Sequence, residues 1–167
     1  PAIPVATDLP LATVIEVHGR ELTVAIDGAK QLAKLSARLL MSQASPVVVG
    51  DQVRVATLTP ELLRIDAVEP RRSVLGRFVA EGRHRASFDP IAANTDLILM
   101  VCTPQSPPFR AGLIDRYFVA AALEGLPLAI CLNKVDLGVD PDVDMMLMGY
   151  ESIGIPVFRI SAAQGLG

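Results

Sequence analysis

The feature that most constrains the fold is a change in the spacing of apolar residues near residue 90. Beyond it, three short runs are apolar at almost every position and stand roughly 30 residues apart: Leu97–Cys102, Leu128–Leu132 and Val157–Ile160. Runs of this kind are typical of strands in a parallel sheet that is covered on both faces. The C-terminal half is therefore expected to contain a small parallel sheet.

Two helices are expected between these strands. Ala111–Glu124 carries apolar residues at helical spacing. Asp140–Ser152 is expected to form the second helix, with Met145, Met146 and Met148 on the side that packs into the core. Strands that alternate with helices predict β-α-β units, so this half is expected to be an α/β unit.

Residues 11–68 have a different pattern, with short runs separated by Gly and Asp-Gly turn signals. Five strands are expected there. They are Leu11–Val17, Leu22–Ile26, Lys30–Met41, Val47–Thr57 (with a break at Gly50-Asp51) and Leu62–Val68. Lys30–Met41 is also compatible with a helix, and we favour a strand because its neighbours are strands. Five strands in so short a segment predict an all-β closed barrel of OB type.

The overall composition excludes several classes of protein. Hydrophobic residues make up 51% of the chain, which is too many for a disordered polar chain. The two cysteines, Cys102 and Cys131, are too few for a disulfide scaffold and lie in apolar runs. No apolar run approaches the roughly 20 residues that span a bilayer, and Pro1–Pro10 has no secretory signal pattern. We therefore expect a soluble cytoplasmic protein with no membrane partner.

Between the two halves, the segment 70–90 is polar and without clear periodicity, and we expect it to be a linker. Within residues 71–85 there is a single acidic residue, Glu81, against five arginines: Arg71, Arg72, Arg77, Arg83 and Arg85. One interpretation is a solvated linker. The other is contact with nucleic-acid phosphates, which a local basic patch can make although the formal net charge of the chain is −3.

Polar residues follow the second and third apolar runs, at the points where the strands are expected to end. Asn133-Lys134-Val135-Asp136 follows Leu128–Leu132, and Ser161-Ala162 follows Val157–Ile160. The carboxyl ends of parallel strands share one edge of a sheet, and ligands bind at that edge in open α/β folds. The two segments are therefore expected to lie together and to form a binding site.

The residue types at this edge suit recognition of guanine. Asp136 can accept hydrogen bonds from the N1–H and the exocyclic amine of that base, whereas adenine has a lone pair at N1 and lacks that amine. Lys134 can lay its methylene stem along the base while its ammonium stays in water. Asn133 can join neighbouring loops, the Ala162 N–H can reach the base carbonyl, and the Ser161 hydroxyl can orient the loop. The alternative is a polar strand-end loop in which Asp136 caps the next turn.

Asn-Lys-x-Asp and Ser-Ala are the base-reading motifs of the GTPase superfamily, but here no phosphate-binding loop precedes them. A barrel comes first, then Ile91–Asp96, and then an apolar strand. In this order of motifs the chain resembles the circularly permuted GTPases of the ribosome small subunit-dependent GTPase A family (RsgA, also called YjeQ). Val49–Val53 and Asp115–Tyr117 are also similar to that family, and the resemblance covers about residues 12–167.

The resemblance implies a parent protein with an OB domain, a permuted GTPase domain and a C-terminal domain that binds Zn²⁺. Such a protein would be a monomer that binds GTP or GDP with Mg²⁺ and hydrolyses GTP during late maturation of the small ribosomal subunit. By the same resemblance, the guanine base would contact Asn133, Lys134, Asp136, Ser161 and Ala162. The barrel and the five arginines would contact ribosomal RNA.

One family motif is absent, because no G-x-x-x-x-G-K-[ST] occurs in the sequence. That loop positions the phosphates and Mg²⁺, so the chain alone is expected to bind guanine nucleotide weakly and to be inactive as a GTPase. We expect no catalytic residue and no metal ligand in this chain.

The predicted organisation is an OB-fold domain over 1–69, an Arg-rich linker over 70–90 and the first part of a permuted GTPase domain over 91–167. An unpaired edge at Leu97–Cys102 is expected to favour self-association. The alternative function is a non-catalytic OB-fold RNA-binding module fused to an incomplete α/β unit.

Overall fold

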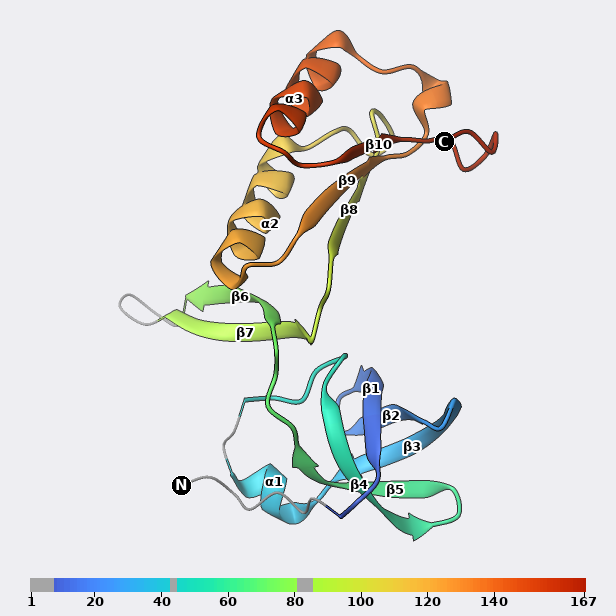
Figure 1. The fold of residues 1–167 in the computed structure, drawn as a ribbon, viewed down its shortest axis with the longest axis vertical. Coiled ribbons are helices and arrows are strands. Elements are labelled where there is room, and N and C mark those ends of the chain that lie inside the picture. Colours follow the sequence, from blue (N-terminus) through green and yellow to red (C-terminus); the bar gives the residue numbers. More distant parts are fainter. Residues whose placement is uncertain (1–7, 43–44, 81–85) are drawn as a thin grey trace. The chain divides into compact units, whose positions relative to one another are not determined.

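A computed structural model describes residues 8–42, 45–80 and 86–167. The chain divides into two compact units, Pro1–Thr95 and Asp96–Gly167. The first unit contains a closed five-stranded barrel and the second a three-stranded parallel sheet (Figure 1). The expected fold class, a barrel followed by an α/β unit, is confirmed. In the described part of the chain, the helices are too short or too polar to cross a membrane.

The barrel closes in the strand order β1-β2-β3-β5-β4. The strands are β1 (Leu11–His18), β2 (Glu21–Ile26), β3 (Ala29–Leu35), β4 (Gln52–Thr59) and β5 (Leu62–Val68). Only β3 and β5 pair in parallel, and the other neighbours are antiparallel. Alternate residues of each strand point inward, and Val14, Val24 and Ile65 at the centre of the core are fully buried.

The segment Lys30–Met41 forms a strand only as far as Leu35. A short helix, α1 (Ala37–Met41), follows it, so the expected continuous strand is wrong for those five residues. Ser36 is the reason for the change, because its hydroxyl accepts a hydrogen bond from Leu39 N at 3.4 Å and caps the helix.

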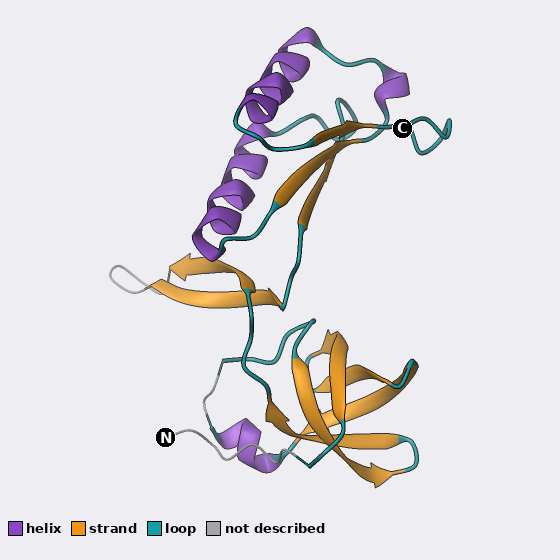
Figure 2. Cartoon of the chain, in the orientation of Figure 1, coloured by secondary structure: helices purple, strands orange, loops and turns teal. Residues whose placement is uncertain are grey.

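The Arg-rich segment 70–90, where we expected no regular structure, contains most of a two-stranded antiparallel sheet (Figure 2). Its strands are β6 (Val74–Ala80) and β7 (Ala86–Ala93). The pairing places Arg77 opposite Asp89, and their side chains form an ion pair at 3.0 Å. The absence of periodicity in this segment was therefore a poor guide, because cross-strand pairing rather than burial of one apolar face holds it together.

In the second unit the strand order is β10-β9-β8, and all three strands are parallel. The elements are β8 (Ile98–Cys102), α2 (Ala111–Glu124), β9 (Leu128–Leu132), the 3₁₀ turn η1 (Val135–Leu137), α3 (Pro141–Ser152) and β10 (Val157–Arg159). Helix α2 is capped at its C-terminus by Gly125, whose φ of 64° is left-handed, a conformation common at helix ends and readily adopted by glycine. Every residue of the central strand β9 is buried.

Both helices cover the same face of this sheet. Consecutive right-handed crossovers that add strands in one direction place their helices on one side. Ile98 and Met100 of β8 face that side and are buried, whereas Leu99, Val101 and Phe158 point to the other side and are 51%, 62% and 55% exposed. The sheet has the two apolar faces expected of a parallel sheet, but only one of them is covered.

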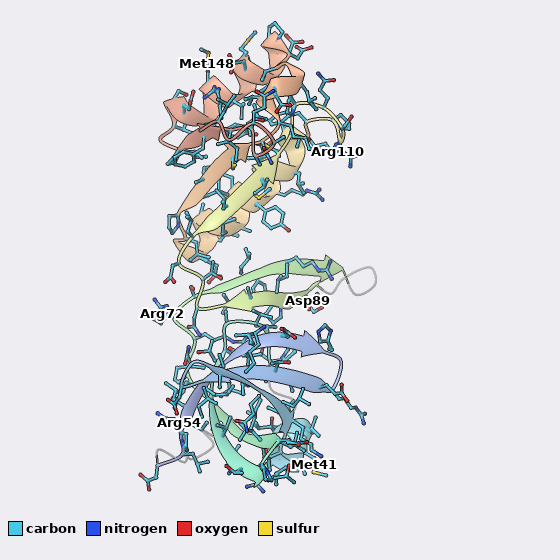
Figure 3. All side chains as sticks on the ribbon, turned by 90° about the vertical axis from the view of Figure 1, so that its right-hand side faces the viewer. Met41, Arg54, Arg72, Asp89, Arg110 and Met148 are labelled. Carbon is cyan, nitrogen blue, oxygen red and sulfur yellow. The ribbon has the colours of Figure 1, made fainter. Side chains whose placement is uncertain are left out.

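The methionines of α3 do not face the core. Met145, Met146 and Met148 are 66%, 46% and 59% exposed, and Met148 projects from the outer side of the helix (Figure 3). Val143 and Leu147 are the residues that α3 buries. The expectation of a core-facing methionine side was wrong because both sides of this helix carry apolar residues, so spacing alone does not identify the buried one.

Candidate functional site

The loops that follow β8, β9 and β10 meet at the carboxyl edge of the parallel sheet, and the loop after β9 lies between the other two. Asn133 starts this central loop, where its backbone N–H donates to Cys102 O at the end of β8 at 2.9 Å. Val135 N donates to Ile160 O, just beyond β10, at 3.2 Å. The backbone itself therefore joins the Asn133–Asp136 segment to both neighbouring strand ends.

Asn133 connects this segment to the Ser161-Ala162 loop through its side chain. The Asn133 Oδ1 accepts hydrogen bonds from Lys134 N at 2.7 Å and from Ala162 N at 3.0 Å. One carbonyl oxygen has two lone pairs, so it can accept both. In this structure the Ala162 N–H, which we considered as a donor to a base carbonyl, is engaged by Asn133.

The Ser161-Ala162 loop also holds Asp136, through a hydrogen bond from Ser161. The Ser161 hydroxyl donates to Asp136 Oδ1 at 2.5 Å and accepts Gln164 N at 3.2 Å. Ser161 is fully buried, whereas Asp136 and Ala162 are exposed. The buried Ser161 hydroxyl thus fixes the position of Asp136 Oδ1. Within the described residues, no hydrogen bond is made by Asp136 Oδ2, which is available to a ligand at the surface.

Lys134 turns the opposite way, toward the loop after β8. Its φ of 64° is in the left-handed region, which is uncommon for a residue with a side chain. The Lys134 ammonium donates to Ser106 O at 3.0 Å. The structure therefore brings together all five residues expected at the base site, with Lys134 tied to one flanking loop and Asn133 and Asp136 tied to the other.

The arginines of the Arg-rich segment do not form a single group. Arg71 is 15% exposed and forms a two-pronged ion pair with Asp51, which is fully buried; the Nε–Oδ1 distance is 2.7 Å and the Nη2–Oδ2 distance is 2.8 Å. Arg77 is 68% exposed and pairs with Asp89. Arg83 and Arg85 lie outside the described residues. Arg71 therefore has a structural partner, while Arg77 keeps most of its surface accessible.

The Asp51–Arg71 pair belongs to a junction that the sequence did not reveal. Asp51 Oδ2 also accepts Val48 N at 2.9 Å, and Asn94 Nδ2 donates to Gly50 O at 2.9 Å. A Cβ on Gly50 would stand 2.0 Å from Ala93 O, so only glycine fits at its φ of 90°. The junction fastens the ends of the β6–β7 pair to the barrel.

Among the described residues, there is no group of three or more His, Cys, Asp or Glu side chains that could hold a metal ion. Burial raises the pKa of the Cys102 thiol to about 11. Burial, and then the hydrogen bond to Asp115 Oδ1 at 2.6 Å, raise the pKa of the Tyr150 hydroxyl, which ties α3 to α2.

The comparisons with known proteins identify the family and the fold of the chain. The sequence model of the RsgA GTPase family matches residues 68–167. The chain belongs to the RsgA GTPase family. A curated RsgA relative, the small ribosomal subunit biogenesis GTPase of Chlorobaculum parvum, is 37% identical over 127 residues, which are 72% of this chain and 41% of that protein.

Two solved structures share the fold. YjeQ from Thermotoga maritima has a TM-score of 0.68 and 23% identity, with 95% of this chain and 54% of that chain covered. YloQ, described as a circularly permuted GTPase, has a TM-score of 0.62 and 21% identity, with 92% and 52% covered. This chain spans less than half the length of the curated RsgA relatives it matches. The expected resemblance to the RsgA family is confirmed.

Proposed function

We propose that this chain supplies the guanine-reading edge and an RNA-contacting barrel of a ribosome-associated GTPase, which hydrolyses GTP during late maturation of the small ribosomal subunit. The observation that carries the proposal is the hydrogen-bonded cluster of Asn133, Asp136, Ser161 and Ala162 at the carboxyl edge of β9 and β10. The names of the RsgA relatives support the ribosomal role.

In this proposal Asp136 reads the base. Its Oδ1 is oriented by Ser161, and the carboxylate accepts the N1–H and the exocyclic amine of guanine. Lys134 covers one face of the base with its methylene stem. The hydrogen bond from Ala162 N to Asn133 Oδ1 holds the Ser161 loop beside the Asn133–Asp136 segment.

In this proposal, residues outside this chain bind the phosphates and hydrolyse GTP. The sequence has no G-x-x-x-x-G-K-[ST], so we propose that 91–167 is the first part of a permuted GTPase domain and that the chain alone does not hydrolyse GTP. The exposed side chains of Leu99, Val101 and Phe158 support this division, because the second apolar face of the sheet requires a cover. Mg²⁺ with GTP or GDP, and Zn²⁺ in a C-terminal domain, would belong to the complete, monomeric, cytoplasmic protein.

The RNA contact is proposed for the barrel domain over 1–69 and the segment 70–90 that follows it. Arg77 is the best supported contact, because it is exposed and its partner Asp89 is also partly exposed, so a phosphate can compete for it at low cost. Arg72 is exposed as well. Arg71 is not proposed as a phosphate contact, since the buried Asp51 carboxylate already holds it.

The test is a titration of the isotope-labelled chain with guanosine monophosphate (GMP) and adenosine monophosphate (AMP), followed by NMR. GMP should shift the amide signals of Asn133–Asp136 and Ser161–Ala162, and AMP should bind about ten- to hundredfold more weakly because a charged hydrogen bond is lost. Equal affinities, or shifts confined to the barrel, would favour the alternative of a non-catalytic RNA-binding module.

A further inference from the structure

We propose that the loop Thr103–Pro107, after β8, is a positioning element for Lys134, and that Gln105 is the residue that holds this loop in place. The inference rests on the proposed function, because it explains how one side chain of the guanine site is oriented before any nucleotide arrives. Gln105 is a positioning residue, since it acts on Lys134 only through the loop.

The loop is fastened at several points within the second unit. Pro104 is buried, and the Thr103 hydroxyl donates to Pro107 O at 2.8 Å, which closes the loop across its ends. Ser106, between them, has a φ of 50°, in the left-handed region. A non-glycine residue adopts that conformation only where its surroundings hold it there. In this conformation the Ser106 carbonyl oxygen accepts a hydrogen bond from a donor outside the loop.

Gln105 joins this loop to the turn that carries Asp136. Its Nε2 donates to Leu137 O at 2.7 Å, and Gly138 O lies 3.5 Å away. Leu137 is the last residue of η1, directly after Asp136. The two loops are thus linked by a side-chain amide, in addition to the backbone hydrogen bond between Asn133 N and Cys102 O.

The link between the two loops holds the acceptor of the Lys134 ammonium in place. Its side chain is exposed, and a free lysine at such a place would sample many rotamers. Instead the ammonium is bound to Ser106 O at 3.0 Å. A side chain that is ordered before binding loses less conformational entropy when the ligand arrives, so the affinity for the base increases.

The first readout needs no nucleotide. The chain has three lysines, Lys30, Lys34 and Lys134, and the order of each ammonium can be compared by ¹⁵N relaxation at mildly acidic pH. We expect the Lys134 ammonium to be more ordered than that of Lys34, and Gln105→Ala to remove the difference. Gln105→Glu, which keeps the shape but has no N–H to donate, should do the same.

The matched control is Gln31→Ala, because the Gln31 Nε2 also donates to a backbone carbonyl, Pro60 O, at 2.9 Å in the barrel. It should leave the Lys134 ammonium unchanged. The second readout is GMP affinity, for which Gln105→Ala should raise the Kd roughly two- to tenfold, the effect of one hydrogen bond, and Gln31→Ala should not.

The inference is overturned if Lys134 is as mobile as Lys34 in the wild-type chain, or if Gln105→Ala leaves its order unchanged, whatever the nucleotide result. It is also overturned if Lys134 is released while the Kd for GMP stays the same. Failure of the proposed function has a different signature, in which the wild-type chain fails to prefer GMP over AMP although Lys134 is ordered and depends on Gln105.

Discussion

Replacement of Asp51 by alanine should destabilise the first unit far more than loss of an exposed carboxylate. The Asp51 side chain is fully buried and accepts three hydrogen bonds, from Val48 N at 2.9 Å, Arg71 Nε at 2.7 Å and Arg71 Nη2 at 2.8 Å. Asp51→Ala removes the counter-charge of Arg71, whose side chain is only 15% exposed in the wild-type structure. Breaking a buried pair from one side costs about 3–5 kcal/mol.

We expect the lower end of that range, about 3 kcal/mol, because Arg71 keeps two other acceptors. These are Ser45 Oγ at 3.0 Å and Pro46 O at 2.7 Å. With a denaturant slope of about 1.5 kcal/mol per molar urea, the urea midpoint should fall by about 2 M. The control is Asp89→Ala, which removes an exposed partner of Arg77 and should cost about 0–1 kcal/mol.

The assay separates the two units of the chain. There is no tryptophan, and both tyrosines, Tyr117 and Tyr150, lie in the second unit. Tyrosine fluorescence therefore follows the α/β unit, while the far-ultraviolet circular dichroism also follows the barrel. The reasoning is refuted if Asp51→Ala costs no more than Asp89→Ala. It is also refuted if Arg71→Met, added to Asp51→Ala, recovers no stability, because the uncompensated charge would then not be the cause.

Three further predictions concern other surfaces. Arg77→Ala should weaken binding to ribosomal RNA and reduce the slope of log affinity against log salt concentration by about 1. Arg71→Ala should lower the stability of the first unit instead. Filter binding at several salt concentrations measures the slope. Because burial raises the pKa of Cys102 to about 11, only about one thiol in a thousand is ionised at pH 8, and its alkylation rate should rise about tenfold per pH unit up to that pKa. A rate that is flat between pH 7 and 9 would disagree. Val101→Lys should reduce self-association of the chain in sedimentation experiments, since Val101 is 62% exposed on the uncovered sheet face, and Lys34→Ala, in the barrel, should not.

Much of the fold could be predicted because the pattern of apolar residues along each strand follows the pattern of buried positions. Leu128–Leu132 is apolar at every position and is buried at every position, and the barrel strands alternate as their inward and outward residues do. Ser36 shows the limit of that method. We favoured a strand up to Met41 because the neighbouring segments are strands, but the Ser36 hydroxyl caps a helix there, and five residues are too few for periodicity to decide.

The proximity of the candidate-site residues could be predicted from the sequence, but the direction of their side chains could not. Strand order and spacing were enough to expect Asn133–Asp136 beside Ser161-Ala162, since parallel strands end at one edge. The direction of the Lys134 side chain could not be predicted, because it depends on the Ser106 carbonyl, 28 positions away in the sequence. Arg71 could not be distinguished from its neighbours for the same reason, as its partner Asp51 is 20 positions away in the sequence, just before β4.

The most direct test of the proposed function is a change of base preference at Asp136. Asp136→Asn keeps an oxygen for the Ser161 hydroxyl but replaces the other acceptor with an amide donor, which suits the carbonyl of xanthine rather than the amine of guanine. In NMR titrations with GMP and xanthosine monophosphate, we predict that the wild-type chain prefers GMP and that Asp136→Asn prefers the xanthine nucleotide. An unchanged preference for GMP in the variant would contradict the assignment of this edge as a guanine-reading site.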